Sequence, residues 1–145
     1  MKRSLFTLLL TTALAIGPVF AAEDSDDEVN ARKVALDLAG AFANEGFKLR
    51  DGHWTGSFAP GKSAIHQVNL FAGNQYWFSL GATEKATKVA VSIFDEKGKP
   101  VAYEPYQDAA SAAAGFSPTI SGAYLIKVEL VEGAAASFCL VYSYK

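Results

Sequence analysis

Residues Gly56–Ser63 have the spacing of a phosphate-binding loop. In their sequence, GSFAPGKS, the glycines, the lysine and the serine have the spacing found in the phosphate-binding loop of nucleotide hydrolases. Asp95 and Glu96 follow an apolar run, as acidic residues that hold magnesium do at the end of a strand in those enzymes. That chemistry needs a buried strand before the loop and a helix after it, so that backbone N–H groups cradle the phosphates. The polar stretch 48–55 and the alternating stretch 64–71 provide neither. We therefore interpret Gly56–Ser63 as a Pro-Gly turn between strands.

Two histidines and one cysteine are the next candidates for metal or nucleophilic chemistry. His53 and His66 have no third ligand at a metal-type spacing, and no Gly-x-Ser-x-Gly motif accompanies them. We expect His53 in a turn and His66 on a strand face beside Val68, satisfied by a hydrogen bond; a small hydrolase that uses either histidine is the alternative. Cys139 lies in an apolar run and is interpreted as a small buried hydrophobic residue. The sequence predicts no catalytic residue and no metal ligand.

Aromatic residues outside the expected core offer a binding site instead. Flat rings can stack on sugar rings or anchor a peptide. Tyr103, Tyr106 and Asp108 share a predicted loop that combines rings, carboxylates and a proline, and Trp54 is expected in a loop or on the face opposite the core. These four residues form the predicted ligand-binding site. The alternative is packing, with Trp77 beneath an N-terminal helix and the two tyrosines closing one end of the domain.

Composition limits the protein to one domain with a substantial core. The chain has 145 residues, of which 50% are hydrophobic, and its formal charge is -2. The charge argues against nucleic acid as a partner, because phosphates require a basic face. A single cysteine cannot form an internal disulfide.

Residues 1–21 match a secretory signal peptide. A basic start precedes the apolar run Leu5–Ile16, and Val19 and Ala21 suit a signal peptidase. A membrane anchor is the alternative, but a span needs roughly 18 to 20 apolar residues and this run stops at Gly17. We predict a periplasmic or secreted protein with no transmembrane segment after signal cleavage.

Residues 22–46 are predicted to form an acidic segment and one helix. Ser25 and Glu28 have the spacing of a capping box, and Gly46 supplies a stop. Five of the six residues in Glu23–Glu28 are acidic, which favours a solvated helix start; a calcium site is the alternative, and no other cofactor is expected. The stripe predicted to pack on the domain is Val34, Leu38, Ala41 and Phe42.

Residues 47–145 are predicted to form a β-sandwich, because their hydrophobic period changes to two. About seven short strands result, and no helices alternate with them. Gly73-Asn74 and Asp95–Pro100 predict hairpin turns, whereas the alanine-rich stretch Ala109–Gly115 is predicted to be a loop. The expected fold is mainly β: an antiparallel, jelly-roll-like sandwich with one N-terminal α-helix.

The stretch Ile65–Tyr144 resembles the bacterial pre-peptidase C-terminal domain. The resemblance implies a secreted, jelly-roll-like sandwich of the kind that accompanies exported peptidases and other extracellular enzymes, with some members binding polymers or calcium. This chain differs in carrying a helix ahead of the sandwich and no catalytic domain within its 145 residues. The matching motifs are Ala72-Gly73-x-x-Tyr76-x-Phe78, Asp95-x-x-Gly98, Phe116-Ser-Pro118 and Ser121-Gly122-x-Tyr124-x-Ile126-x-Val128.

These observations favour binding over catalysis. We expect a non-catalytic binding or adaptor module of the cell envelope that recognises a polysaccharide or a protein through loops of the sandwich. The alternative is a structural or assembly protein that docks on a larger exported complex through its helix or a sheet edge.

Overall fold

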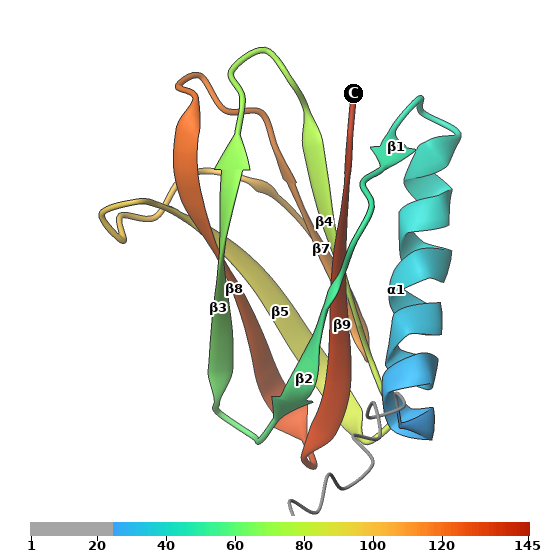
Figure 1. The fold of residues 1–145 in the computed structure, drawn as a ribbon. Coiled ribbons are helices and arrows are strands. Elements are labelled where there is room, and N and C mark those ends of the chain that lie inside the picture. The colour runs from blue at the N-terminus through green and yellow to red at the C-terminus, as the bar shows by residue number, and fades with distance from the viewer. Residues whose placement is uncertain (1–24) are drawn as a thin grey trace, which may run out of the picture.

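Two antiparallel sheets face each other in the computed structural model, and one helix lies on the outside of the larger sheet (Figure 1). The structure describes residues 25–145, so the predicted signal peptide and the first residues of the acidic segment lie outside the described part. No helix within residues 25–145 has the length and apolar character needed to cross a membrane. The elements are α1 (Asp26–Ala43), β1 (Lys48–Leu49), β2 (Trp54–Phe58), β3 (Ser63–Leu70), β4 (Tyr76–Ala82), β5 (Ala86–Asp95), β6 (Glu104–Asp108), β7 (Ser111–Phe116), β8 (Gly122–Gly133) and β9 (Ala136–Tyr144).

The strands alternate between the two sheets, as in a jelly roll. The first sheet has the order β1-β9-β4-β7-β6, with β2 also paired to β9, and the second has the order β3-β8-β5. The chain therefore changes sheet after most strands, which confirms the predicted antiparallel sandwich. One detail of the prediction is wrong: Gly73-Asn74 forms a turn, but β3 and β4 belong to different sheets and are not a hairpin. The turn connects the sheets because both strands bury their apolar faces in one core between them.

The core fills the space between the sheets with the residues that alternate inward along each strand. Along β3 the inward positions are 64, 66, 68 and 70, as their period predicts. The largest fully buried side chains in this layer include Phe78, Leu80, Ile126 and Leu140. The Pro60-Gly61 turn joins β2 to β3 and no helix follows it, so the phosphate-loop pattern is a turn between strands, as interpreted.

The helix α1 packs on the outer face of β4 and β9 through its smallest side chains. Ser25 caps its start by accepting a hydrogen bond from the Glu28 N–H, at 3.2 Å between Oγ and N, as the capping pattern predicts. The predicted stripe is wrong: the fully buried positions are three alanines, whereas Val34, Leu38 and Phe42 flank them and Ala41 is exposed. The buried alanines are Ala31, Ala35 and Ala39, and they contact Cys139 and Val141.

Gly81 explains why alanines form this contact. A Cβ atom at Gly81 would stand 2.3 Å from the backbone nitrogen of Ala35 and 2.5 Å from the carbonyl oxygen of Ala31. The helix backbone thus rests directly on the strand, and larger side chains fit only beside the contact line. Phe42, for example, stacks on Trp77 with ring centroids 4.2 Å apart and an 8° angle between the planes. Trp77 therefore packs beneath the helix, the alternative considered from the sequence.

Two predicted loops are strands. The predicted aromatic loop forms β6, the edge strand of the larger sheet, where Pro105 is tolerated because one side of an edge strand needs no hydrogen bonds. The alanine-rich stretch contributes β7, in which Ala112, Ala113 and Ala114 are all buried. Because the helix-covered side and the core cover the two faces of β7, only methyl groups fit at these positions. Packing therefore outweighs the weak strand propensity of alanine.

Candidate functional site

The two lateral sides of the sandwich are closed differently. On the β5 and β6 side, the Gln107 side chain donates a hydrogen bond to the Val89 carbonyl, at 2.8 Å between Nε2 and O. On the opposite side, β2 and β3 diverge from their shared turn (Figure 1), and they belong to different sheets. There, the rings of Trp54 and His66 lie 5.3 Å apart. Above this ring pair the gap widens into an open groove.

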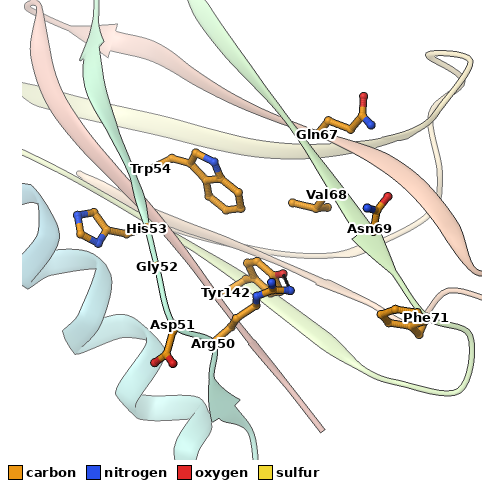
Figure 2. A pocket seen from close by; sticks show the side chains of 10 residues that line it. All are labelled: Arg50, Asp51, Gly52, His53, Trp54, Gln67, Val68, Asn69, Phe71 and Tyr142. Carbon is orange, nitrogen blue, oxygen red and sulfur yellow. Dashed lines mark hydrogen bonds between the residues drawn. The ribbon is translucent and has the colours of Figure 1, made fainter.

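This open space, here called the β2–β3 groove, has a volume of about 590 Å³. Its lower part is formed by inward side chains of β2, β3 and β9, and Figure 2 shows the lining residues around one hollow. It continues past Arg50 and Phe71 into a second hollow of about 290 Å³ that reaches Asn74 and Tyr144. The complete lining of the first hollow is Arg50, Asp51, Gly52, His53, Trp54, Gln67, Val68, Asn69, Phe71 and Tyr142.

A bulge in the edge strand shapes one wall of the groove. Leu49 pairs with Ser143, the Arg50 N–H bonds the Tyr142 carbonyl, and Trp54 pairs with Leu140. Residues 51–53 consequently stand opposite a single residue of β9. Gly52, at φ +95°, allows this detour, since left-handed backbone favours glycine. The bulge keeps Arg50 and Trp54 on the inward face while it separates them, which opens room between their side chains.

Aromatic rings dominate the inner surface of the groove. Trp54 is half-buried and stacks on Tyr142, with centroids 5.9 Å apart and an interplanar angle of 13°. Tyr142 is only 7% exposed, so Trp54 presents most of the accessible ring surface at this end. Phe71, just after β3, is 61% exposed and presents a second ring at the other end. Two separated rings along an open groove suit an extended ligand.

Arg50 supplies the positive charge of the groove. Its Nη1 donates to the Tyr142 hydroxyl at 2.6 Å, and its guanidinium carbon lies 5.5 Å from the centre of the Tyr142 ring. Burial raises the pKa of Tyr142, and the Arg50 charge opposes that rise. The phenol therefore stays neutral at ordinary pH and accepts the hydrogen bond from Arg50. On the opposite wall, β3 contributes Gln67, Val68 and Asn69, of which Val68 points inward.

The two histidines occupy different surroundings. His53 was expected in a turn and lies instead in the bulge between β1 and β2, where its Nε2 is 3.4 Å from Nη1 of Arg32 on α1. His66 points inward beside Val68, but the expected hydrogen bond is absent: its Nε2 is buried without a partner among the described residues. Burial lowers the pKa of His66, so this imidazole is held in its neutral form. Among the ten residues that line the first hollow, His53 is included and His66 is not.

The four residues of the predicted binding site do not come together. Trp54 lines the β2–β3 groove, whereas Tyr103 lines a separate surface hollow of about 440 Å³ beside Trp77. Tyr106 lies on the helix-covered face of the larger sheet, at its β6 edge, and is 42% exposed. Tyr103 packs partly against the core, as its alternative interpretation stated. Asp108 is exposed at the end of β6 and lines neither of these hollows.

Arg50, Phe71 and Tyr142 were not predicted as site residues. In the sequence, Tyr142 is one of several alternating apolar residues of the last strand, and Phe71 is the last residue of an alternating run. Neither pattern indicates a binding site. A partial signal existed at Arg50, which precedes Asp51-Gly52 and thus stands at the start of a turn close to Trp54. Sequence spacing could not show that this turn is a bulge against β9.

The structure describes only part of the acidic segment, and it places Cys139 beneath α1. Asp26, Asp27 and Glu28 form the first turn of α1, and residues 25–145 contain no cluster of His, Cys, Asp or Glu suited to a metal ion. Glu23 and Asp24 lie outside these residues. Cys139 is fully buried, as expected, but between the larger sheet and α1 rather than in the main core.

No family model matches the chain, and no curated protein matches it. The resemblance to the pre-peptidase C-terminal domain therefore stays a prediction.

Proposed function

We propose that this chain is an exported, non-catalytic binding module that holds a polysaccharide of the cell envelope in the β2–β3 groove. The observation that carries the proposal is the pair of accessible rings, Trp54 and Phe71, at separated positions in one elongated groove. The apolar face of a pyranose stacks on such rings, and a guanidinium group such as that of Arg50 bonds its hydroxyls. The signal-peptide pattern of residues 1–21 supports the export part of the proposal.

The chemistry of the groove favours binding over hydrolysis. Of the ten residues that line its first hollow, Asp51 is the single carboxylate, and none is a serine or a cysteine. Glycoside hydrolysis ordinarily needs two carboxylates facing each other across the bond to be cleaved. Asp51 also points away from the hollow in Figure 2. A ligand would thus be held and released unchanged.

Affinity electrophoresis and pull-down on immobilised polysaccharides test this proposal. The purified protein, with its N-terminus determined by mass spectrometry, is assayed on polysaccharide fractions of a bacterial cell envelope and on neutral and acidic reference polymers. Because Phe71 is exposed, Phe71→Ala should leave the fold intact and weaken retention about tenfold, as loss of about 1.4 kcal/mol from one ring contact would. Trp54→Ala should weaken retention at least as much.

Tyr106→Ala is the matched control, because it removes an exposed ring on β6, away from the groove. Its retention should equal that of the parent. Loss of retention with Tyr106→Ala but not with Phe71→Ala would place the site on β6 and refute the groove. Retention on none of the polymers would refute the function. An N-terminus at Met1 in protein made by a secreting host would refute export.

A further inference from the structure

Arg50 is shared by the two hollows of the β2–β3 groove. Arg50 lines both hollows, and so it lies where an extended ligand passes from one to the other. The hydroxyl and the ring of Tyr142 hold it in place from one side. A guanidinium offers five N–H donors, and the Tyr142 hydroxyl uses one of them. Most of its hydrogen-bonding capacity remains available to a ligand.

No carboxylate of the described residues neutralises Arg50. Within residues 25–145, the ion pairs are Lys85 with Asp27 and Lys127 with Glu129, and both lie away from the groove. Asp51 follows Arg50 in sequence but forms no ion pair with it, and Figure 2 shows its side chain directed away from the guanidinium. The arginine thus keeps an uncompensated charge at a fixed position beside Trp54.

We infer that the groove selects acidic polysaccharides, with Arg50 binding the carboxylate of a uronic acid unit while Trp54 and Phe71 stack on neighbouring sugar rings. This inference rests on the proposed function and names its ligand class. A carboxylate matches the planar fork of a guanidinium with two parallel hydrogen bonds. Tyr142 acts as a positioning residue, because it fixes the guanidinium before the ligand arrives and so reduces the entropy lost on binding.

The charge of the whole chain makes this selectivity diagnostic. With a formal net charge of -2, the protein has no overall attraction for a polyanion. A preference for an acidic polymer over its neutral form must therefore come from a local cation. In the groove, Arg50 is that cation.

Polygalacturonate and its fully methyl-esterified form test the inference, since esterification removes the carboxylate charges and keeps the sugar backbone. The parent protein should bind the acid form about tenfold or more tightly than the ester, the gain expected of a charge-assisted hydrogen bond. Raising the salt concentration should shrink that preference. Equal binding of both forms would overturn the inference.

Arg50→Gln should remove the preference by lowering acid-form affinity about tenfold and leaving ester affinity within about twofold. Lys88→Gln, the same loss of charge on an exposed residue of β5, should change neither. Tyr142→Phe keeps the ring and removes the anchoring hydroxyl, so it should reduce the acid preference about threefold. If Arg50→Gln weakened both forms equally, Arg50 would be a structural residue and the inference would be wrong.

The two failures are distinguishable. If both polymers bind equally and Phe71→Ala weakens both, the binding function stands and the acidic selectivity fails. If neither polymer is retained, nor any other polysaccharide, the function fails and the inference fails with it.

Discussion

Gly81 is the position where one added methyl group should disturb the protein most. Gly81 lies on β4 directly beneath α1, and the atoms that a Cβ would meet, at 2.3 and 2.5 Å, belong to the helix backbone. Backbone atoms cannot rotate away as a flexible side chain can. Because ordinary contact begins near 3.4 Å, Gly81→Ala requires α1 to move outward by about 1 Å.

That movement has an estimable cost. A gap of about 0.5 to 1 Å forfeits a quarter to a half of the van der Waals attraction along a packed contact, and overpacking commonly costs about 1 to 3 kcal/mol. Since the whole Ala31, Ala35 and Ala39 contact is affected, we expect the upper end, a loss of about 3 kcal/mol in the free energy of unfolding. That is a large part of the roughly 5 to 15 kcal/mol typical of a domain.

Gly40→Ala provides a matched control with the opposite sign. Gly40 lies in α1, and a Cβ added there would have no neighbouring atom within 4 Å, so the same methyl group meets open space. Alanine is the better helix former, and the free energy of unfolding should rise by about 0.5 to 1 kcal/mol.

Urea denaturation followed by circular dichroism measures both changes. In a Trp54→Phe background the fluorescence comes from Trp77, which is stacked on Phe42, so a red-shifted emission in native Gly81→Ala protein would report a displaced helix. A Gly81→Ala variant within about 0.5 kcal/mol of its parent, with unchanged Trp77 emission, would refute the close helix–sheet contact.

Three further perturbations test single features of the fold. Burial lowers the pKa of His66, so the unfolded chain binds the proton first as the pH falls below about 6.5. The free energy of unfolding should therefore decline as the pH falls from about 7 to about 5, by less than about 1.4 kcal/mol per pH unit. Urea titrations at each pH measure this decline, which should be less steep in His66→Phe. Ser25→Ala removes the acceptor of the Glu28 N–H and should cost about 1 kcal/mol in the same assay; an unchanged urea midpoint would contradict the cap. Ala109 has φ +48°, so Ala109→Gly should relieve backbone strain and raise the thermal midpoint by a few degrees, corresponding to about 0.5 to 1 kcal/mol; a lower midpoint would show that the turn is unstrained.

The sequence predicted the fold class because most strands have one face buried in the core and a more exposed face on the other side. Along β3 and β8 the inward residues other than His66 are apolar and their neighbours are more polar, and period two follows directly. The prediction failed where both faces are covered. In β7, alanines face the core and the helix-covered side alike, so no alternation marks the strand.

The helix stripe failed for a related reason. Hydrophobic size was used to identify the buried face of α1, but the closest packing selects the smallest side chains. Only Gly81, forty or more residues away, reveals that Ala31, Ala35 and Ala39 form the contact. Local sequence does not contain that information.

Of the candidate site, Trp54 alone could be identified in advance. It was conspicuous as a tryptophan in a polar stretch. Its partners Arg50 and Tyr142 are 92 residues apart in sequence and meet through an edge-strand bulge, a feature set by tertiary pairing rather than by residue type.

The absence of strand pairing between β2 and β3 has a consequence for which residues of this protein can be substituted. The hydrogen-bonded ladders join β2 to β9 and β3 to β8, so no ladder crosses the groove itself. Exposed lining residues such as Phe71 and Gln67 can therefore be exchanged without disturbing strand pairing. Under the proposed binding function, ligand preference and foldability would therefore be largely separate traits of this fold, and the groove would be a suitable starting point for selecting new specificities.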